Sequence, residues 1–177
     1  VAQRLLAYLE AAKDPNGFSG ENFGKIINRP NRFIPNDLVE SFQKQDYPKA
    51  FFEQILKAFK TEMEYKEKIK SWRKKCAEIE KINQNEDDKN IEPPLEPKAP
   101  ASLKLAQDFA TLKEGWHRKN LIEFFKTINE LAKDYANKSP SELIQTIINK
   151  ADFRVKEDDK SLTDKVGEEV IVDILRE

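Results

Sequence analysis

The feature that most constrains the fold is a long stretch without a helix breaker. From Pro48 to Pro93 no glycine or proline interrupts the chain, and apolar residues recur at intervals of three and four. This spacing predicts one helix from about Pro48 to about Ile82, roughly 50 Å long. In its second half the apolar residues follow a coiled-coil-like seam, which calls for one partner helix rather than a globular core. These seam residues are Tyr65, Ile69, Trp72, Cys76 and Ile79.

A segment of different composition follows this helix. Residues 83–100 contain the acidic run Asn85-Glu86-Asp87-Asp88 and four prolines, and they carry few apolar residues. Such a composition predicts an exposed, flexible acidic and Pro-rich tip at 83–100. Helical spacing resumes from Leu105 to Tyr135, and we expect it to form the return arm of an antiparallel helical hairpin. In that hairpin the seam should pack against Leu105, Phe109 and Leu112.

Turn and capping residues divide the rest of the chain into shorter helices. A helix from Val1 should stop at Asp14-Pro15-Asn16-Gly17, Ser19 can cap a second, and Pro35 can begin a third. Ser139-Pro140-Ser141-Glu142 supplies a cap, a proline and a capping-box glutamate for a further helix. A last helix is expected after Ser161, with a short strand as the alternative. The prediction is therefore an all-α, irregular helical single domain over 1–177 with a long antiparallel hairpin.

The amino-acid composition limits which classes of function this chain can have. Lys and Arg number 31 against 32 Asp and Glu, so a nucleic-acid partner would have to be met by a local basic patch. One cysteine and one histidine exclude an internal disulfide and leave little for a zinc site. No apolar run approaches the roughly 20 residues of a membrane span, which predicts a cytoplasmic protein without membrane contact. Because the chain begins at Val1 within a helical pattern, we expect a segment of a larger protein.

The sequence contains no recognisable catalytic constellation. It lacks the Gly-x-x-x-x-Gly-Lys-Ser/Thr phosphate loop and the glycine spacing of dinucleotide sites. His117 and Cys76 are far apart in sequence, and we expect Cys76 in the helix seam and His117 facing solvent. We therefore predict no enzyme activity, no cofactor and no metal for this chain, and interpret it as a binding or regulatory module.

Two segments resemble a known family. Leu5 to Ala12, a short break and then Phe23-Gly24-Lys25-Ile26-Ile27-Asn28-Arg29-Pro30-Asn31-Arg32 resemble the start of the 2B subdomain in UvrD/PcrA/Rep-type superfamily 1 DNA helicases. The segment from Ser139 to Phe153 is similar to a later helix of that subdomain. Family members continue past the arginine with Gly-Ile/Val-Gly, where this chain has Phe33-Ile34-Pro35.

The resemblance implies a non-catalytic accessory subdomain that contacts duplex DNA and regulates unwinding. ATP and magnesium would then be cofactors of the parent helicase, bound in other subdomains that are also partners of this one. Further protein partners are possible. The rival hypothesis is a protein-protein interaction scaffold built on the long hairpin, with no nucleic-acid role.

The candidate DNA-binding residues surround the loop between the second and third helices. Lys and Arg side chains there, with amides and the free N–H groups of the third helix, could hold a phosphate. These residues are Lys25, Arg29, Asn31, Arg32 and Asn36. The alternative is that Arg29 and Arg32 pair with Asp37 or Glu40 and hold the loop. A second basic cluster, at 66–75, could track a nucleic-acid backbone or form a solvated helix face.

Overall fold

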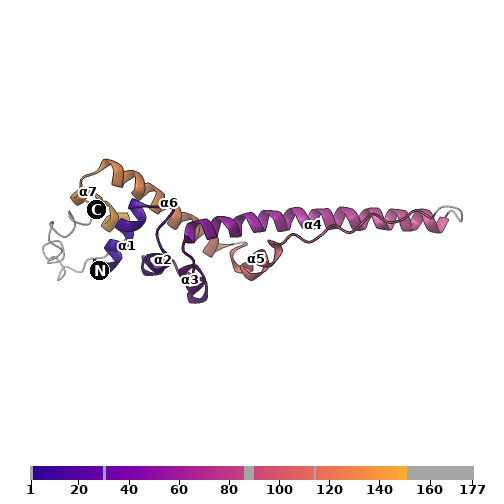
Figure 1. The fold of residues 1–177 in the computed structure, drawn as a ribbon, viewed down its shortest axis with the longest axis horizontal. Helices are drawn as coiled ribbons and strands as arrows, with labels where there is room; N and C mark the ends of the chain where they lie inside the picture. Colours follow the sequence, from indigo (N-terminus) through magenta and orange to yellow (C-terminus); the bar gives the residue numbers. More distant parts are fainter. Residues whose placement is uncertain (1, 30, 86–89, 114, 151–177) are drawn as a thin grey trace. The chain divides into compact units, whose positions relative to one another are not determined.

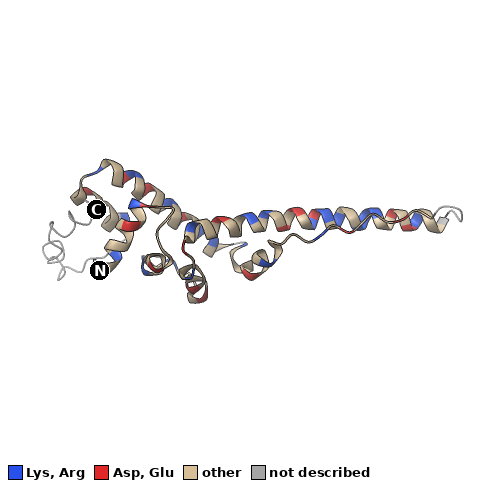
Figure 2. Ribbon diagram, in the orientation of Figure 1, with Lys and Arg blue, Asp and Glu red and all other residues tan. Residues whose placement is uncertain are grey.

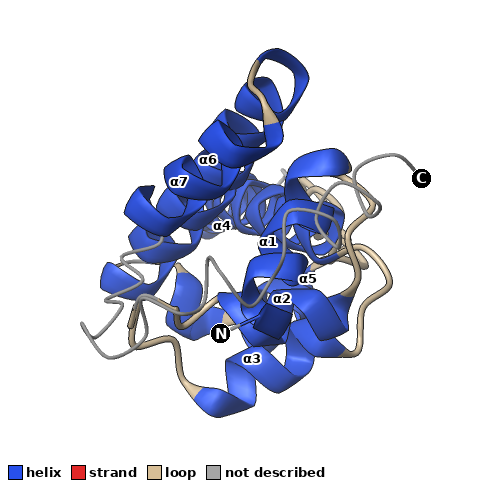
Figure 3. Cartoon of the chain, turned by 90° about the vertical axis from the view of Figure 1, so that its left-hand side faces the viewer, coloured by secondary structure: helices blue, strands red, loops and turns tan. Residues whose placement is uncertain are grey.

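The computed structural model describes residues 2–29, 31–85, 90–113 and 115–150. Over these residues the chain is helical, with no strand (Figure 3), which confirms the predicted all-α class. The elements are α1 (Ala2–Lys13), α2 (Gly20–Ile26), α3 (Asn36–Gln43), α4 (Pro48–Asn85), α5 (Leu103–Asp108), the 3-10 helix η1 (Ala110–Leu112), α6 (Trp116–Asn137) and α7 (Pro140–Lys150), labelled in Figure 1. None of the helices described has the length and apolarity that crossing a membrane requires.

The chain divides into two compact units. The first unit comprises residues 1–52 and 114–177, and the second comprises residues 53–113. Helix α4 begins in the first unit and continues through the second. The expectation of a single helical domain stays a prediction.

An aromatic cluster forms the core of the first unit. Phe23 on α2 stacks on Phe42 of α3, with ring centroids 5.1 Å apart, and meets Phe124 of α6 edge-on at 5.5 Å. Phe52, at the start of α4, stacks on Phe125 at 5.4 Å. All five rings are buried. Because four helices each contribute a ring, this cluster fixes α2 and α3 against α6.

The capping residues set the helix ends as predicted. Ser19 caps α2 by accepting a hydrogen bond from the Asn22 N–H at 3.3 Å. At α7 the Glu142 carboxylate accepts the Ser139 N–H at 3.0 Å, which is one half of a capping box. Gly20 allows α2 to approach the end of α3, since a Cβ there would lie 2.3 Å from the Gln43 carbonyl oxygen. The predicted last helix lies outside the described residues.

Helix α4 confirms the predicted long helix. It has 38 residues, and at 1.5 Å per residue it is about 57 Å long. Lys, Arg and Glu residues are interspersed along this helix (Figure 2), which is typical of a solvated helix.

The return arm beside α4 is extended rather than helical. Residues 90–102 run back along the helix (Figure 1), and three side chains of α4 bind this segment. Tyr65 Oη donates to the Pro97 carbonyl at 3.4 Å, and Trp72 Nε1 donates to the Pro94 carbonyl at 2.7 Å. Asn83 exchanges two hydrogen bonds, each 3.0 Å, with the main chain of Ile91. The described part of this segment is mostly exposed and is hydrogen-bonded to α4. Residues 86–89 of the predicted tip lie outside the described residues, and the flexibility of the tip stays a prediction.

The predicted partner of the seam is therefore wrong. Trp72 lies opposite Pro94 and not opposite the helix that contains Leu105. A polyproline-like chain advances about 3.1 Å per residue, twice the rise of a helix, so three residues from Pro94 to Pro97 span the seven from Tyr65 to Trp72. Four prolines lack N–H donors, which excludes a helix here and favours this extended form. The return helix starts only at Leu103 and is broken into α5, η1 and α6.

The second unit contains a buried carboxylate with two cationic partners. Glu62 is 7% exposed, and its carboxylate lies 2.7 Å from Lys113 Nζ and 3.1 Å from Lys66 Nζ. The hydrogen bond from Lys113 lowers the pKa of Glu62; burial opposes this and Lys66 adds to it. Because the pKa of Glu62 is lower in the folded state than in the unfolded state, these interactions stabilise the fold fully at a pH above the unfolded pKa. The stabilisation is lost as the pH falls through the folded pKa.

We predict that Glu62→Gln destabilises the second unit by on the order of 1–3 kcal/mol at pH 7 and has almost no effect at about pH 2. The reason is that the wild-type carboxyl is itself neutral at low pH. Trp72 reports on this unit, so its fluorescence during thermal unfolding, in a Trp116→Phe background, measures the effect.

Glu78→Gln serves as the control for this measurement. Glu78 lies on the same helix, but its carboxylate is 60% exposed and 3.9 Å from Lys74 Nζ, so its loss should change little. An equal destabilisation by Glu62→Gln at both pH values would contradict the ionic account.

Candidate nucleic-acid interface

One asparagine closes the loop between α2 and α3. Asn28 Nδ2 donates to the Ile34 carbonyl at 2.8 Å, and the Ile34 N–H donates to Asn28 Oδ1 at 2.9 Å. The Asn28 side-chain amide thus bonds to both the N–H and the carbonyl of Ile34, as the main chain of a neighbouring strand would. It holds together two residues that are six positions apart. Ile34 is buried, so the loop is anchored at its end as well as at its start.

Arg32 points inward from this loop. Its Nη1 donates to the Ile27 carbonyl at 2.9 Å and to the Ile26 carbonyl at 3.4 Å, which are acceptors at the end of α2. The guanidinium also lies 5.2 Å from the centroid of the Phe124 ring. Arg32 is therefore part of the loop's framework. Of the two interpretations of this arginine, the one in which it holds the loop fits, and carbonyl oxygens and an aromatic ring are among its partners.

Two further side chains hold the loop from neighbouring helices. Tyr8 of α1 donates its hydroxyl to the Arg29 carbonyl and, at 3.4 Å, to the Ile26 carbonyl. Burial raises the pKa of Tyr8, with Arg32 opposing this effect, so the hydroxyl stays a donor at neutral pH. Asn120 of α6 is buried and donates from Nδ2 to the Arg32 carbonyl at 2.8 Å. Sequence patterning did not indicate these roles, because each contact joins residues that are far apart along the chain.

The other four predicted site residues lie on the surface of the loop or beside it. Arg29 and Asn36 are exposed, and Asn36 begins α3. Asn31 is exposed but uses its Oδ1 to accept the Phe33 N–H at 3.0 Å. Lys25 lies 2.7 Å from the Glu21 carboxylate, so an anion would have to displace that carboxylate. The structure brings all five candidates to one loop region but leaves Arg29 as its most available cation.

Phe33 and Trp116 form an exposed aromatic pair that the sequence did not predict. Their ring centroids are 5.3 Å apart, and the residues are 59% and 51% exposed. Phe33 has a φ of 52°, which is rare for a residue with a Cβ. Trp116 begins α6 after Gly115, whose φ is 107°. In the sequence, the one signal that pointed to this position of Trp116 was the glycine directly before it.

His117 differs from its expected position. It is half-buried rather than facing solvent, and its ring centroid lies 5.6 Å from that of Trp116. Its Nδ1 atom is buried and has no hydrogen-bond partner within the described part of the chain. Cys76 is half-buried on α4.

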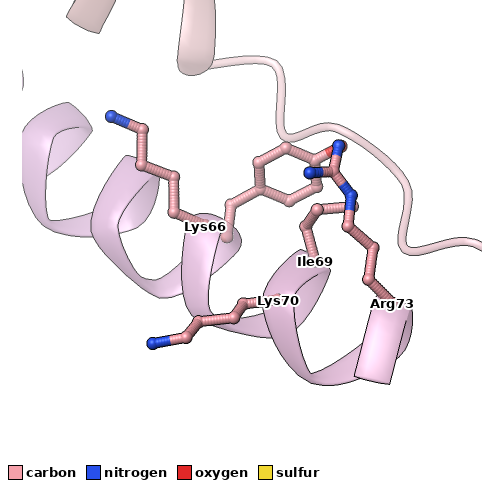
Figure 4. A pocket seen from close by; sticks show the side chains of 5 residues that line it. Lys66, Ile69, Lys70 and Arg73 are labelled. Carbon is pink, nitrogen blue, oxygen red and sulfur yellow. The ribbon is translucent and has the colours of Figure 1, made fainter. Parts of the chain in front are cut away.

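The second basic cluster forms no converging site. Around it lies an open groove of about 350 Å³, lined by Tyr65, Lys66, Ile69, Lys70 and Arg73 (Figure 4). The amino groups of Lys66 and Lys70 point in different directions in that view. Lys66 is also bound to Glu62, and Lys74 lies 3.9 Å from Glu78. These contacts favour the interpretation as a solvated face.

The structure and the comparisons add no cofactor and no relative. Over the described ranges, no cluster of His, Cys, Asp or Glu could hold a metal ion. Comparisons with protein-family models, with curated proteins and with solved structures gave no match.

We predict that Asn28→Ala destabilises the first unit by about 1–3 kcal/mol, because it leaves the Ile34 N–H and carbonyl without their partner. Asn36→Ala, at an exposed position of the same loop region, should change the free energy of unfolding by less than about 0.5 kcal/mol. Urea denaturation followed by Trp116 fluorescence, in a Trp72→Phe background, measures both. Equal stabilities of the two variants would show that the Asn28 bracket does not hold the loop.

Proposed function

We propose that this chain is a non-catalytic accessory subdomain of an ATP-dependent DNA helicase, which contacts the phosphate backbone of duplex DNA through the loop 28–36. The proposal starts from the resemblance of Leu5 to Arg32 and of Ser139 to Phe153 to the 2B subdomain of UvrD/PcrA/Rep-type helicases. By contacting the duplex, the subdomain would regulate unwinding by the parent enzyme.

The observation that carries the proposal is the backbone conformation of Phe33. Family members have the first glycine of their DNA-contacting loop at this position, and a φ of 52° is a conformation that glycine favours. At Phe33 the loop therefore has a backbone conformation that glycine adopts readily, which supports the comparison with the family's glycine loop. A strained conformation of this kind persists only where the surrounding structure holds it, as Asn28, Asn31 and Asn120 do here.

Charge and rigidity also support contact with a phosphate. Residues 24–36 include Lys25, Arg29 and Arg32 and contain no Asp or Glu. Because Tyr8 of α1, Asn120 of α6 and the loop's own Asn28 already hold the loop, little ordering entropy would be lost on binding. Arg29 would make the main ionic contact, and Asn36 would add a polar one. Asp37 in the first turn of α3 limits what the helix dipole adds.

The proposal assigns catalysis to other parts of the parent protein. The chain lacks a phosphate loop, so ATP and magnesium would bind in the helicase's other subdomains, which become partners of this one. Sustained ATP hydrolysis by the purified chain would contradict this assignment.

A second candidate function is a protein-protein interaction scaffold. It is favoured by apolar residues in the second unit that are exposed: Ile82 and Ile91 at 40% and Leu95 at 95%. The absence of any DNA binding by the intact chain would favour this candidate over the first.

We predict that Arg29→Ala weakens binding of unrelated duplex sequences to the same extent. One phosphate contact is lost, so the slope of log K against log salt should become shallower by about one unit. Binding itself should be weak, independent of sequence and strongly salt-dependent. Fluorescence anisotropy with two labelled duplexes over a salt series measures these effects.

Lys133→Ala is the matched control for this experiment. Lys133 is an exposed cation of the same unit, on α6 about 20 Å along the helix from Asn120. An affinity that responds equally to both variants, or a preference for one sequence that Arg29→Ala abolishes, would contradict the proposed contact. Arg32 is unsuitable for the test because its removal would disturb the loop.

A further inference from the structure

The aromatic pair of Phe33 and Trp116 serves no evident purpose in folding. Both rings keep more than half of their surface in water, so they contribute little hydrophobic stabilisation. Phe33 also adopts a left-handed backbone conformation, which is unfavourable for residues with a Cβ. Glycine would relieve that strain, so folding alone does not account for a phenylalanine here.

The pair is nevertheless held in a fixed position. Asn120 lies one turn after Trp116 on α6, and it binds the carbonyl of Arg32, the residue directly before Phe33. The Phe33 N–H is bound by Asn31, and the residue after Phe33 is bracketed by Asn28. The two rings therefore come from segments 83 positions apart and are set side by side by these hydrogen bonds. Such an arrangement is preorganised to receive a ligand.

The charge around the pair indicates an anionic ligand. Residues 24–36 and 115–122 together contain five Lys or Arg and no Asp or Glu, although acidic residues slightly outnumber basic ones in the whole chain. These five cations are Lys25, Arg29, Arg32, Arg118 and Lys119. Lys25 lies 2.7 Å from the Glu21 carboxylate, and Lys119 lies 3.9 Å from the Glu123 carboxylate. Arg32 is bound to carbonyl oxygens, so Arg29 is the cation most available to an anionic ligand. An aromatic surface among cations is how proteins hold single-stranded nucleic acid, since each base offers a flat π-face and each nucleotide a phosphate.

We propose that Phe33 and Trp116 form a stacking platform for an unpaired base of a DNA strand. The inference rests on the proposed function, in which Arg29 contacts the adjoining duplex. Bases inside a duplex have both faces covered by their neighbours, so only an unpaired or terminal base can stack on the platform. The ring planes are 36° apart, so one base lies flat on one ring and meets the other at an angle. The chain then prefers a junction of double and single strand to continuous duplex.

The test compares two DNA ligands of equal charge. Both have the same duplex, and one carries a single-stranded thymidine overhang whereas the other carries an overhang of abasic nucleotides of equal length. The full chain should bind the thymidine form about tenfold more tightly, since removing one stacking partner typically has an effect of this size. Phe33→Gly and Trp116→Ala should abolish the difference and leave binding to the abasic form unchanged.

The choice of variants keeps the test decisive. Phe33→Gly suits the backbone at that position, so it should fold even if Trp116→Ala does not. Tyr47→Ala is the control, because Tyr47 is another exposed aromatic residue of the first unit, at 58%. It should keep the preference for the thymidine overhang.

The outcomes separate this inference from the function on which it rests. Equal binding of both ligands by the wild type, with an affinity that still falls in Arg29→Ala, would overturn the platform and leave duplex contact in place. A preference that survives Phe33→Gly, or that Tyr47→Ala also removes, would likewise overturn the platform. If neither ligand binds, the proposed duplex contact and the platform are both wrong.

Discussion

The exchange of two hydrogen bonds between Asn28 and the main chain of Ile34 determines how the loop between α2 and α3 is built. It brings the two ends of the loop together. In this loop Arg32 turns inward onto the carbonyls of α2 and the ring of Phe124, while Phe33 is pushed outward with a positive φ. Without the Asn28 bracket, neither the inward arginine nor the strained aromatic residue would be held.

This framework separates residues that hold the loop from residues that can meet a ligand. Tyr8, Asn28, Arg32 and Asn120 are buried or half-buried and bind main-chain atoms. Arg29 and Phe33 are exposed on the same loop, and Trp116 lies against Phe33. Arg32, which the sequence placed among the binding residues, thus holds the loop. Trp116, which falls within the predicted return arm from Leu105 to Tyr135, lies on the surface.

Local signals predicted most of the fold. The breaks at Asp14-Pro15-Asn16-Gly17 and at Ser139-Pro140, and the uninterrupted helix after Pro48, depend on neighbouring residues and were confirmed. The course of residues 90–102 could not be predicted in this way, because Tyr65, Trp72 and Asn83 hold it through bonds to its main chain and not through apolar spacing. Tyr8 and Asn120 bind main-chain atoms 21 and 88 positions away along the chain. The periodicity of apolar residues carries no information about such long-range contacts. The five candidate residues were chosen from local composition, which placed them in one loop region but did not show that Arg32 faces inward.

The central claim is that this loop, with Arg29 and the Phe33–Trp116 pair, is the surface that meets DNA. Amide and indole NMR spectra of the isotopically labelled chain, recorded at low salt as a short duplex with an overhang is added, test it most directly. The largest shifts should fall on the amides of Arg29 to Phe33 and on the Trp116 indole, with the Trp72 indole and the α4 residues of the groove unmoved. Shifts that are largest along Lys66 to Arg73, or an unchanged spectrum at saturating DNA, would contradict the account.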